Sequence, residues 1–212
     1  MNRWTRTVVA ALTAVSLLGI PMLAGADTKD DANRLRASRA TERYEVAVSG
    51  TSIKAGGGRV FVNAPLAAVR RVVTDYAHYE DFMPRFKRSR VVGKTARTTD
   101  VYLQVPILHG AATVWSLTRF EAPRRLADGT EVIEGRMVQG NVKDFRATWY
   151  LTPIDDQHTL LRAELLIVPS LPLPGSMVTG ELAYAADKGV TASRDRAEAA
   201  TVRVANTAPT TP

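Results

Sequence analysis

The feature that most constrains the fold is an alternation of apolar and polar residues in the second half of the chain. Over residues 159–168, Leu161, Ala163 and Leu165 alternate with Arg162 and Glu164, and residues 145–152 alternate in the same way. Successive side chains of a β-strand point to opposite faces of its sheet. This period of two therefore predicts an antiparallel sheet with one covered face and one solvated face.

Turn signals divide this half of the chain into six expected strands. Asp128-Gly129 is a strong two-residue hairpin signal, and Pro153 to Asp156 is typical of a turn. The strands are expected at about residues 85–93, 100–105, 111–120, 130–138, 145–152 and 159–168.

The preceding part of the chain mixes strands and short helices. Residues 44–48 and 59–63 are predicted to be extended, with the glycine-rich segment 54–58 forming a turn between them. Pro65 suits the first position of a helix, and a second short helix is expected to end at Pro84.

A long helix is predicted near the C-terminus. The proline-rich segment 169–175 breaks the strand pattern, and Ser176 is a candidate N-cap of a helix that runs to about residue 199. Many residues of this helix are small, which indicates a cavity between it and a curved sheet. Its expected buried stripe is Val178, Leu182, Ala186 and Val190.

One segment carries a family resemblance. From Arg59 to Pro84 the chain reads RVFVNAPLAAVRRVVTDYAHYEDFMP. It resembles the opening of START-like (SRPBCC) proteins, especially the polyketide cyclase/dehydrase and coenzyme-Q-binding branch, and the resemblance extends over residues 46–198. It implies an α+β helix-grip fold, in which a curved antiparallel sheet wraps a long C-terminal helix and two short helices follow the first strand.

The resemblance also implies a function class. Members of this family enclose an apolar cavity for lipids, sterols, quinones, polyketides or hormones; most bind or transfer their ligands, and a minority catalyse cyclisation or aromatisation. We therefore expect a binding or carrier protein for an apolar, lipid-like ligand. A cyclase or aromatase using the same cavity is one alternative, and a surface-binding module of the cell envelope without a cavity ligand is another.

Strand alternation and the helical stripe select the residues expected to face the ligand. A large Trp and an adaptable Met suit such a pocket, although each residue could equally be ordinary core, and a β-bulge would reverse the parity of a strand. His109, in a loop, could orient a ligand at the cavity mouth or could simply be solvated. The other expected ligand-binding residues are Trp115, Leu117, Met137, Phe145, Trp149, Leu165, Ile167, Met177 and Leu182.

Enzyme signatures are largely missing from the sequence. There is no G-x-S-x-G elbow and no H-E-x-x-H motif, and the glycines of residues 175–180 are not followed by the lysine of a phosphate-binding loop. The chain has no cysteine and three histidines, so we expect no metal site, no cofactor and no catalytic residue. A spatial triad leaves no sequence signature, so an enzyme stays as the alternative. A polar cluster facing the cavity would favour it, and an apolar cavity would favour a binding protein.

The N-terminal segment predicts export. Residues 1–26 carry two arginines, a short apolar run and the small-residue site Ala24-Gly25-Ala26, the three parts of a secretory signal peptide. Cleavage near Ala26 would place the protein in the periplasm or the medium. The expected organisation is a signal peptide (1–26), a flexible leader (27–41), the helix-grip domain (42–204) and a disordered tail (205–212).

The chain is basic, with a formal net charge of +7. Six Lys or Arg residues and no acid fall within residues 85–97, and Arg85, Lys87, Arg88 and Arg90 are the candidates for contact with an anionic membrane surface. The same charges could instead protect an exposed sheet edge. Export makes nucleic acid an improbable partner, and we expect a monomer.

Overall fold

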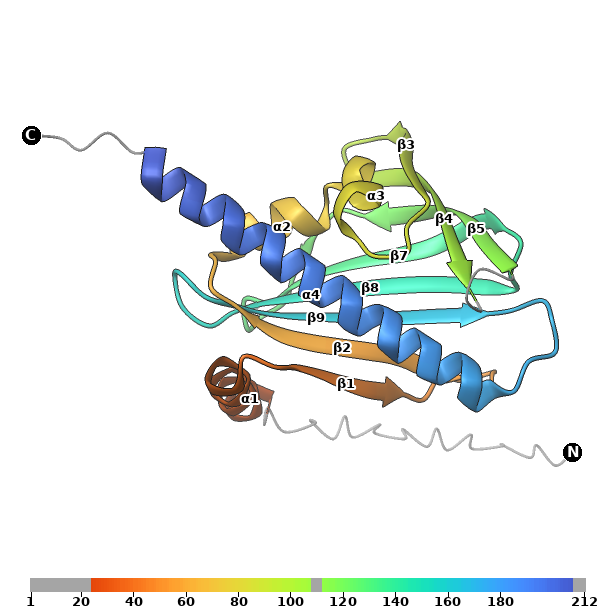
Figure 1. The fold of residues 1–212 in the computed structure, drawn as a ribbon, viewed down its shortest axis with the longest axis horizontal. Helices are drawn as coiled ribbons and strands as arrows, with labels where there is room; N and C mark the ends of the chain where they lie inside the picture. Colours follow the sequence, from red (N-terminus) through yellow and green to blue (C-terminus); the bar gives the residue numbers. More distant parts are fainter. Residues whose placement is uncertain (1–23, 108–111, 208–212) are drawn as a thin grey trace, which may run out of the picture.

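The computed structural model describes residues 24–107 and 112–207, which form one antiparallel sheet with a long helix across one face (Figure 1). The helices are α1 (Ala24–Ser38), α2 (Leu66–Val73), the 3-10 turn η1 (Tyr76–His78), α3 (Tyr79–Phe82) and α4 (Gly175–Thr207). The strands are β1 (Thr41–Val46), β2 (Ala55–Val62), β3 (Arg88–Lys94), β4 (Thr98–Ile107), β5 (Ala112–Glu121), β6 (Arg124–Arg125), β7 (Glu131–Gly140), β8 (Asp144–Pro153) and β9 (Thr159–Val168).

The sheet has the order β1-β2-β9-β8-β7-β5-β4-β3, and the short β6 pairs with β7. This confirms the predicted helix-grip arrangement, and every strand expected in the second half of the chain is present. The Asp128-Gly129 hairpin is also confirmed: Gly129 has a φ of +84°, and the Leu126 N–H donates to the Thr130 carbonyl oxygen over 2.8 Å. Such a left-handed φ favours glycine.

The glycine-rich segment 54–58 is not the predicted turn, because Ala55 to Gly58 form the first half of β2. These glycines serve close packing. A Cβ added at Gly56 would lie 2.0 Å from the backbone nitrogen of Ala183 in α4, and one at Gly58 would lie 2.7 Å from the nitrogen of Asp187. Only strand residues without a side chain allow α4 to approach β2 this closely.

The two short helices lie where the sequence placed them, between β2 and β3. Pro65 precedes the first residue of α2, and its carbonyl oxygen accepts from the N–H of Val69. The second short helix, α3, ends at Phe82, two residues before Pro84. Tyr76 lies over Phe120 of β5 with ring centroids 4.4 Å apart, and this stacking anchors the short helices to the sheet.

The predicted flexible leader is wrong for residues 27–41, which form most of α1 and the start of β1. The segment is mostly polar, but its apolar residues Ala32 and Leu35 are buried against Phe61 and Leu160 and fix the helix to the sheet. Helix α1 therefore covers part of the sheet face opposite α4 (Figure 1). The expected cleavage site after Ala26 falls in its first turn, and the rest of the predicted signal peptide lies outside the described residues.

Helix α4 is longer than predicted. It starts at Gly175, one residue before Ser176, and extends to Thr207 into the predicted tail, whose residues 208–212 lie outside the described part of the chain. Its predicted buried stripe is confirmed, with Val178, Leu182, Ala186 and Val190 all in the core.

Candidate ligand chamber

An apolar chamber of about 80 Å³ lies between the sheet and α4. Its floor comes from β8 and β9, and its side comes from α3 and the residues that follow it, at the end of the segment that carries the family resemblance. Its roof is made of the smallest residues of α4, which leave the space open. The main contributors are Phe145, Trp149 and Leu165 (floor), Met83 and Phe86 (side), and Ala185, Ala186 and Gly189 (roof).

A second apolar cavity of about 40 Å³ lies under the N-terminal part of the same helix. Ile107 and Ile167 line it from the sheet, and Met177 and Leu182 line it from α4. Ala186 and Leu182 are one helical turn apart, so the chamber and the second cavity follow each other along the buried face of α4.

Two polar groups of residues that line the chamber, those of Tyr79 and Glu164, have partners. The hydroxyl of Tyr79, which is fully buried, donates to the Val73 carbonyl oxygen, and burial raises the pKa of this phenol well above its ordinary value. The carboxylate of Glu164 accepts from the hydroxyls of Tyr44 and Tyr150. Among the described residues, no group of three or more acids or histidines is placed to hold a metal ion.

Two ion pairs hold the N-terminal half of α4 in place, and a third joins Arg196, further along the helix, to Asp75. Arg43 of β1 contacts Asp187 over 2.8 Å, and Arg85, in the segment before β3, contacts Glu181 over 3.0 Å. The guanidinium groups of the two arginines also lie 5.0 and 4.8 Å from the centre of the Tyr184 ring. Each arginine therefore combines an ion pair with a cation–π contact to the same helix.

The sequence matches the family model described as polyketide cyclase / dehydrase and lipid transport over residues 62–192, which is more than half of the chain. The chain belongs to this family. None of the curated proteins compared with the sequence matches it.

Solved structures with the same fold include both lipid-transfer proteins and a cyclase. A STAR-related lipid transfer protein from Xanthomonas axonopodis superimposes with a TM-score of 0.65 at 16% identity, covering 74% of this chain and 93% of that one. Human StAR-related lipid transfer protein 5 gives 0.65 at 10% identity, covering 83% and 97%. The Zhui aromatase/cyclase from Streptomyces gives 0.52 at 16% identity, covering 79% and 98%. These likenesses show the START fold that this family member shares.

Most of the residues predicted to face a ligand lie along the buried face of α4. Phe145, Trp149 and Leu165 line the chamber, while Ile167, Met177 and Leu182 line the second cavity. Met137 packs against the same core without lining either space. His109 lies outside the described residues. The prediction missed Met83, Phe86 and the α4 roof. Met83 lies in the segment that carries the family resemblance and the small residues of the helix were a signal for the roof, whereas the sequence held no signal for Phe86.

The inward orientation predicted for Trp115 and Leu117 is wrong. In β5 the residues that face the core are Val114, Ser116, Thr118 and Phe120, so Trp115 points to the other side, where its ring stacks on Tyr102 at 6.2 Å. The polar residues can be buried because the hydroxyls of Ser116 and Thr118 hydrogen-bond each other over 2.7 Å. Alternation in the sequence therefore assigned the wrong face to this strand.

The four candidate membrane-contact residues divide into two groups. Arg85 is engaged by Glu181 and Tyr184 of α4. Lys87, Arg88 and Arg90 are exposed and have no ion-pair partner among the described residues. They lie on or beside β3, the edge strand of the sheet, next to the exposed Val91 and Val92. None of the helices in the described ranges combines the length and apolar character needed to cross a membrane.

Proposed function

We propose that this family member is a non-enzymatic carrier that holds an apolar, lipid-like ligand between its sheet and α4, outside the cytoplasm. The observation that carries the proposal is the apolar chamber beneath α4, whose roof of Ala185, Ala186 and Gly189 leaves space that larger side chains would fill. The ionisable groups of its lining, those of Tyr79 and Glu164, are already hydrogen-bonded, which favours binding by burial of apolar surface over acid–base catalysis. The N-terminal sequence is the support for export.

The chamber must enlarge to take up such a ligand. Its volume of about 80 Å³ is well below the roughly 300–1,000 Å³ of pockets that bury drug-sized molecules. The second cavity continues along the same helix. A displacement of α4 from the sheet would enlarge both spaces together, and it would require breaking at least one of the ion pairs that hold the helix.

The ligand can be sought directly. The protein is purified from an exporting bacterium without detergent, its organic extract is examined by mass spectrometry, and the melting temperature is measured with and without a lipid extract. A co-purifying apolar molecule and a lipid-induced rise in melting temperature would support the proposal. Absence of both would refute it.

Two glycines of α4 provide a matched pair of variants. Gly189 lines the chamber, and a Cβ there would lie 3.7 Å from Trp149, whereas Gly180 is exposed with nothing within 4 Å of an added Cβ. Gly189→Leu should fill the chamber and abolish both lipid signals. Gly180→Leu should keep them, because it changes the helix propensity equally without entering the chamber. Equal ligand retention in the two folded variants would show that the chamber is not the binding site.

We propose in addition that the β3 edge contacts the membrane from which the carrier loads. Lys87, Arg88 and Arg90 are exposed cations beside two exposed valines, a combination suited to an anionic lipid surface. The protein should sediment with vesicles containing phosphatidylglycerol at low salt, less so at high salt, and less so after Arg88→Gln and Arg90→Gln. Binding that ignores both salt and these substitutions would exclude this surface.

A further inference from the structure

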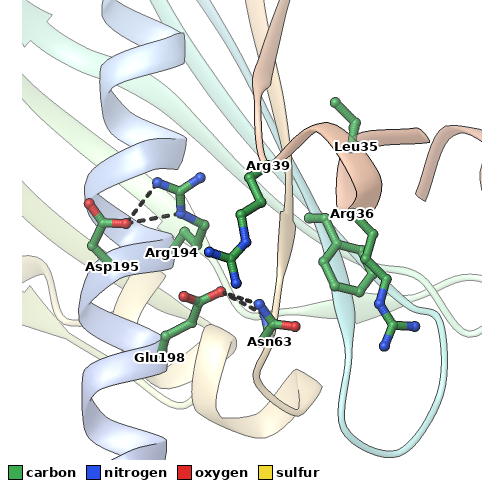
Figure 2. A pocket seen from close by; sticks show the side chains of 8 residues that line it. Leu35, Arg36, Arg39, Asn63, Arg194, Asp195 and Glu198 are labelled. Atoms are coloured by element: carbon green, nitrogen blue, oxygen red, sulfur yellow. Dashed lines mark hydrogen bonds and ion pairs between the residues drawn. The ribbon is translucent and has the colours of Figure 1, made fainter. Parts of the chain in front are cut away.

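A third pocket has a chemistry unlike that of the chamber and the second cavity. It is an open cleft of about 490 Å³ between α1, the end of β2 and the C-terminal half of α4 (Figure 2). Leu35 and Phe61 form an apolar wall, and Arg36, Arg39 and Arg194 supply three guanidinium groups. Its volume falls in the range of small-molecule pockets, and none of its residues lines the chamber.

The acidic residues of the cleft are already engaged. One carboxylate oxygen of Glu198 accepts from the backbone N–H of Asn63 over 2.8 Å and from its side-chain amide over 3.1 Å. Asp195 accepts from Nε and Nη2 of Arg194, which leaves Nη1 of that guanidinium without a partner among the described residues. Glu198 keeps its negative charge because both of its donors are neutral, so the cleft carries three arginines against two carboxylates.

Two arginines remain without a carboxylate. Arg36 lies over the ring of Phe61, 5.6 Å from its centre, and forms no ion pair with the described residues. Arg39 likewise has no ion pair there, and Figure 2 shows its side chain reaching into the space between α1 and α4. Its φ of +53° is a left-handed conformation that is unfavourable for a residue with a side chain and turns the chain from α1 into β1.

We propose that this cleft binds a phosphate group, carried by a soluble phosphate ester or by a phospholipid headgroup. Arginine donors suit phosphate because the guanidinium fork can bind two of its oxygens at once. Here Arg39 of the α1–β1 connection and Arg194 of α4 face the space between the two helices, whereas the side chain of Arg36 extends away from them (Figure 2). The two facing guanidinium groups can bind a phosphate from two sides, and the wall of Leu35 and Phe61 accommodates the apolar part of an ester.

The experiment titrates the full chain with inorganic phosphate, glycerol 3-phosphate and monomeric dihexanoyl phosphatidic acid at constant ionic strength, followed by calorimetry. A dissociation constant of about 1 mM or below is expected for at least one of them. Arg39→Gln and Arg194→Gln should each weaken it about tenfold, which corresponds to losing one charge-assisted hydrogen bond. Tightest binding of glycerol 3-phosphate identifies a soluble ester as the ligand type, and tightest binding of phosphatidic acid identifies a lipid headgroup.

Arg97→Gln is the matched control, because it removes the same charge from the turn between β3 and β4, at the opposite edge of the sheet. It should leave the affinity unchanged. An equal loss of affinity in Arg97→Gln and Arg39→Gln would show that phosphate is attracted only by the general positive charge of the chain, which would refute the cleft. The proposal would also be overturned if the folded wild-type chain bound none of the three ligands at about 10 mM. If phosphatidic acid binds equally to wild type and both cleft variants but not to Gly189→Leu, the lipid occupies the chamber instead, and the cleft proposal fails while the carrier proposal stands.

Discussion

Gly56→Ala tests the closest packing in the molecule. The added Cβ would lie 2.0 Å from the nitrogen of Ala183 and 2.2 Å from the carbonyl carbon of Leu182, whereas ordinary contact begins at 3.4 Å. Both neighbours are backbone atoms of α4, which cannot rotate aside. Strand and helix would have to separate by about 1.4 Å. Overpacking of a core costs about 1–3 kcal/mol, and we expect the upper end here, about 3 kcal/mol.

A graded series separates packing from the general effect of adding a methyl group. At Gly58 the added Cβ would lie 2.7 Å from the nitrogen of Asp187, so Gly58→Ala should cost about 1–2 kcal/mol. At Gly93, in the edge strand β3, it would lie 3.7 Å from Asp100, an ordinary contact, and the change should stay within about 0.5 kcal/mol. None of the three glycines has a left-handed φ, so alanine introduces no backbone strain.

The free energy of unfolding is measured by urea denaturation of each variant, with the midpoint and slope compared to wild type. The order expected is Gly56→Ala, Gly58→Ala and then Gly93→Ala, from most to least destabilised. If Gly56→Ala is no less stable than Gly93→Ala, then α4 does not pack on β2 as closely as described, and the reasoning fails.

Three further perturbations address other contacts. The pKa of Asp187 lies below its ordinary value of 3.8, because hydrogen bonds from Thr41 and Arg43 outweigh the opposing effect of burial. Its contribution to stability is therefore complete above about pH 4 and lost as the pH falls through the lower folded pKa, and Asp187→Asn should flatten that acid limb in pH-dependent denaturation. Arg70→Met leaves the buried carboxylate of Glu131 with only a 3.4 Å contact, so it should cost about 2 kcal/mol in urea unfolding. Leu35→Ala should cost about 2–3 kcal/mol and speed hydrogen exchange in α1, and unchanged exchange would show that this helix is not docked through Leu35.

The sequence predicted the sheet well because its evidence is local. Alternation over residues 145–152 and 159–168 reports directly which face of a strand is covered, and the observed β8 and β9 agree with it. The N-terminal segment of the folded unit was less predictable. The few apolar residues of α1 give it no clear amphipathic pattern, and its order depends on Phe61 and Leu160, which are distant in sequence. The contact that orders this helix is therefore not visible in the segment itself.

The misassigned residues of the site share a physical cause. Sequence reasoning gave Trp115 to the cavity by strand alternation and gave the glycines before Arg59 to a turn because they are flexible. In the fold, a buried pair of hydroxyls satisfies itself beside Trp115, and the glycines permit a helix to approach. Both outcomes depend on the neighbouring element, which a residue's own chemistry does not reveal. The chamber residues of β8 were predictable because alternation and burial agree there.

Small residues have opposite effects on the two sides of α4. This difference determines how the chamber would open. Toward β1 and β2, glycines bring the helix into close contact, and the carboxylate of Asp187 that pairs with Arg43 is only 6% exposed. Toward α3, the chamber leaves space, and the pair formed by Arg85 and Glu181 is 35% and 41% exposed. An exposed ion pair contributes little stability, whereas separating a buried carboxylate from its partner is costly. Opening by rotation about the β2 contact would therefore break the pair formed by Arg85 and keep the pair formed by Arg43.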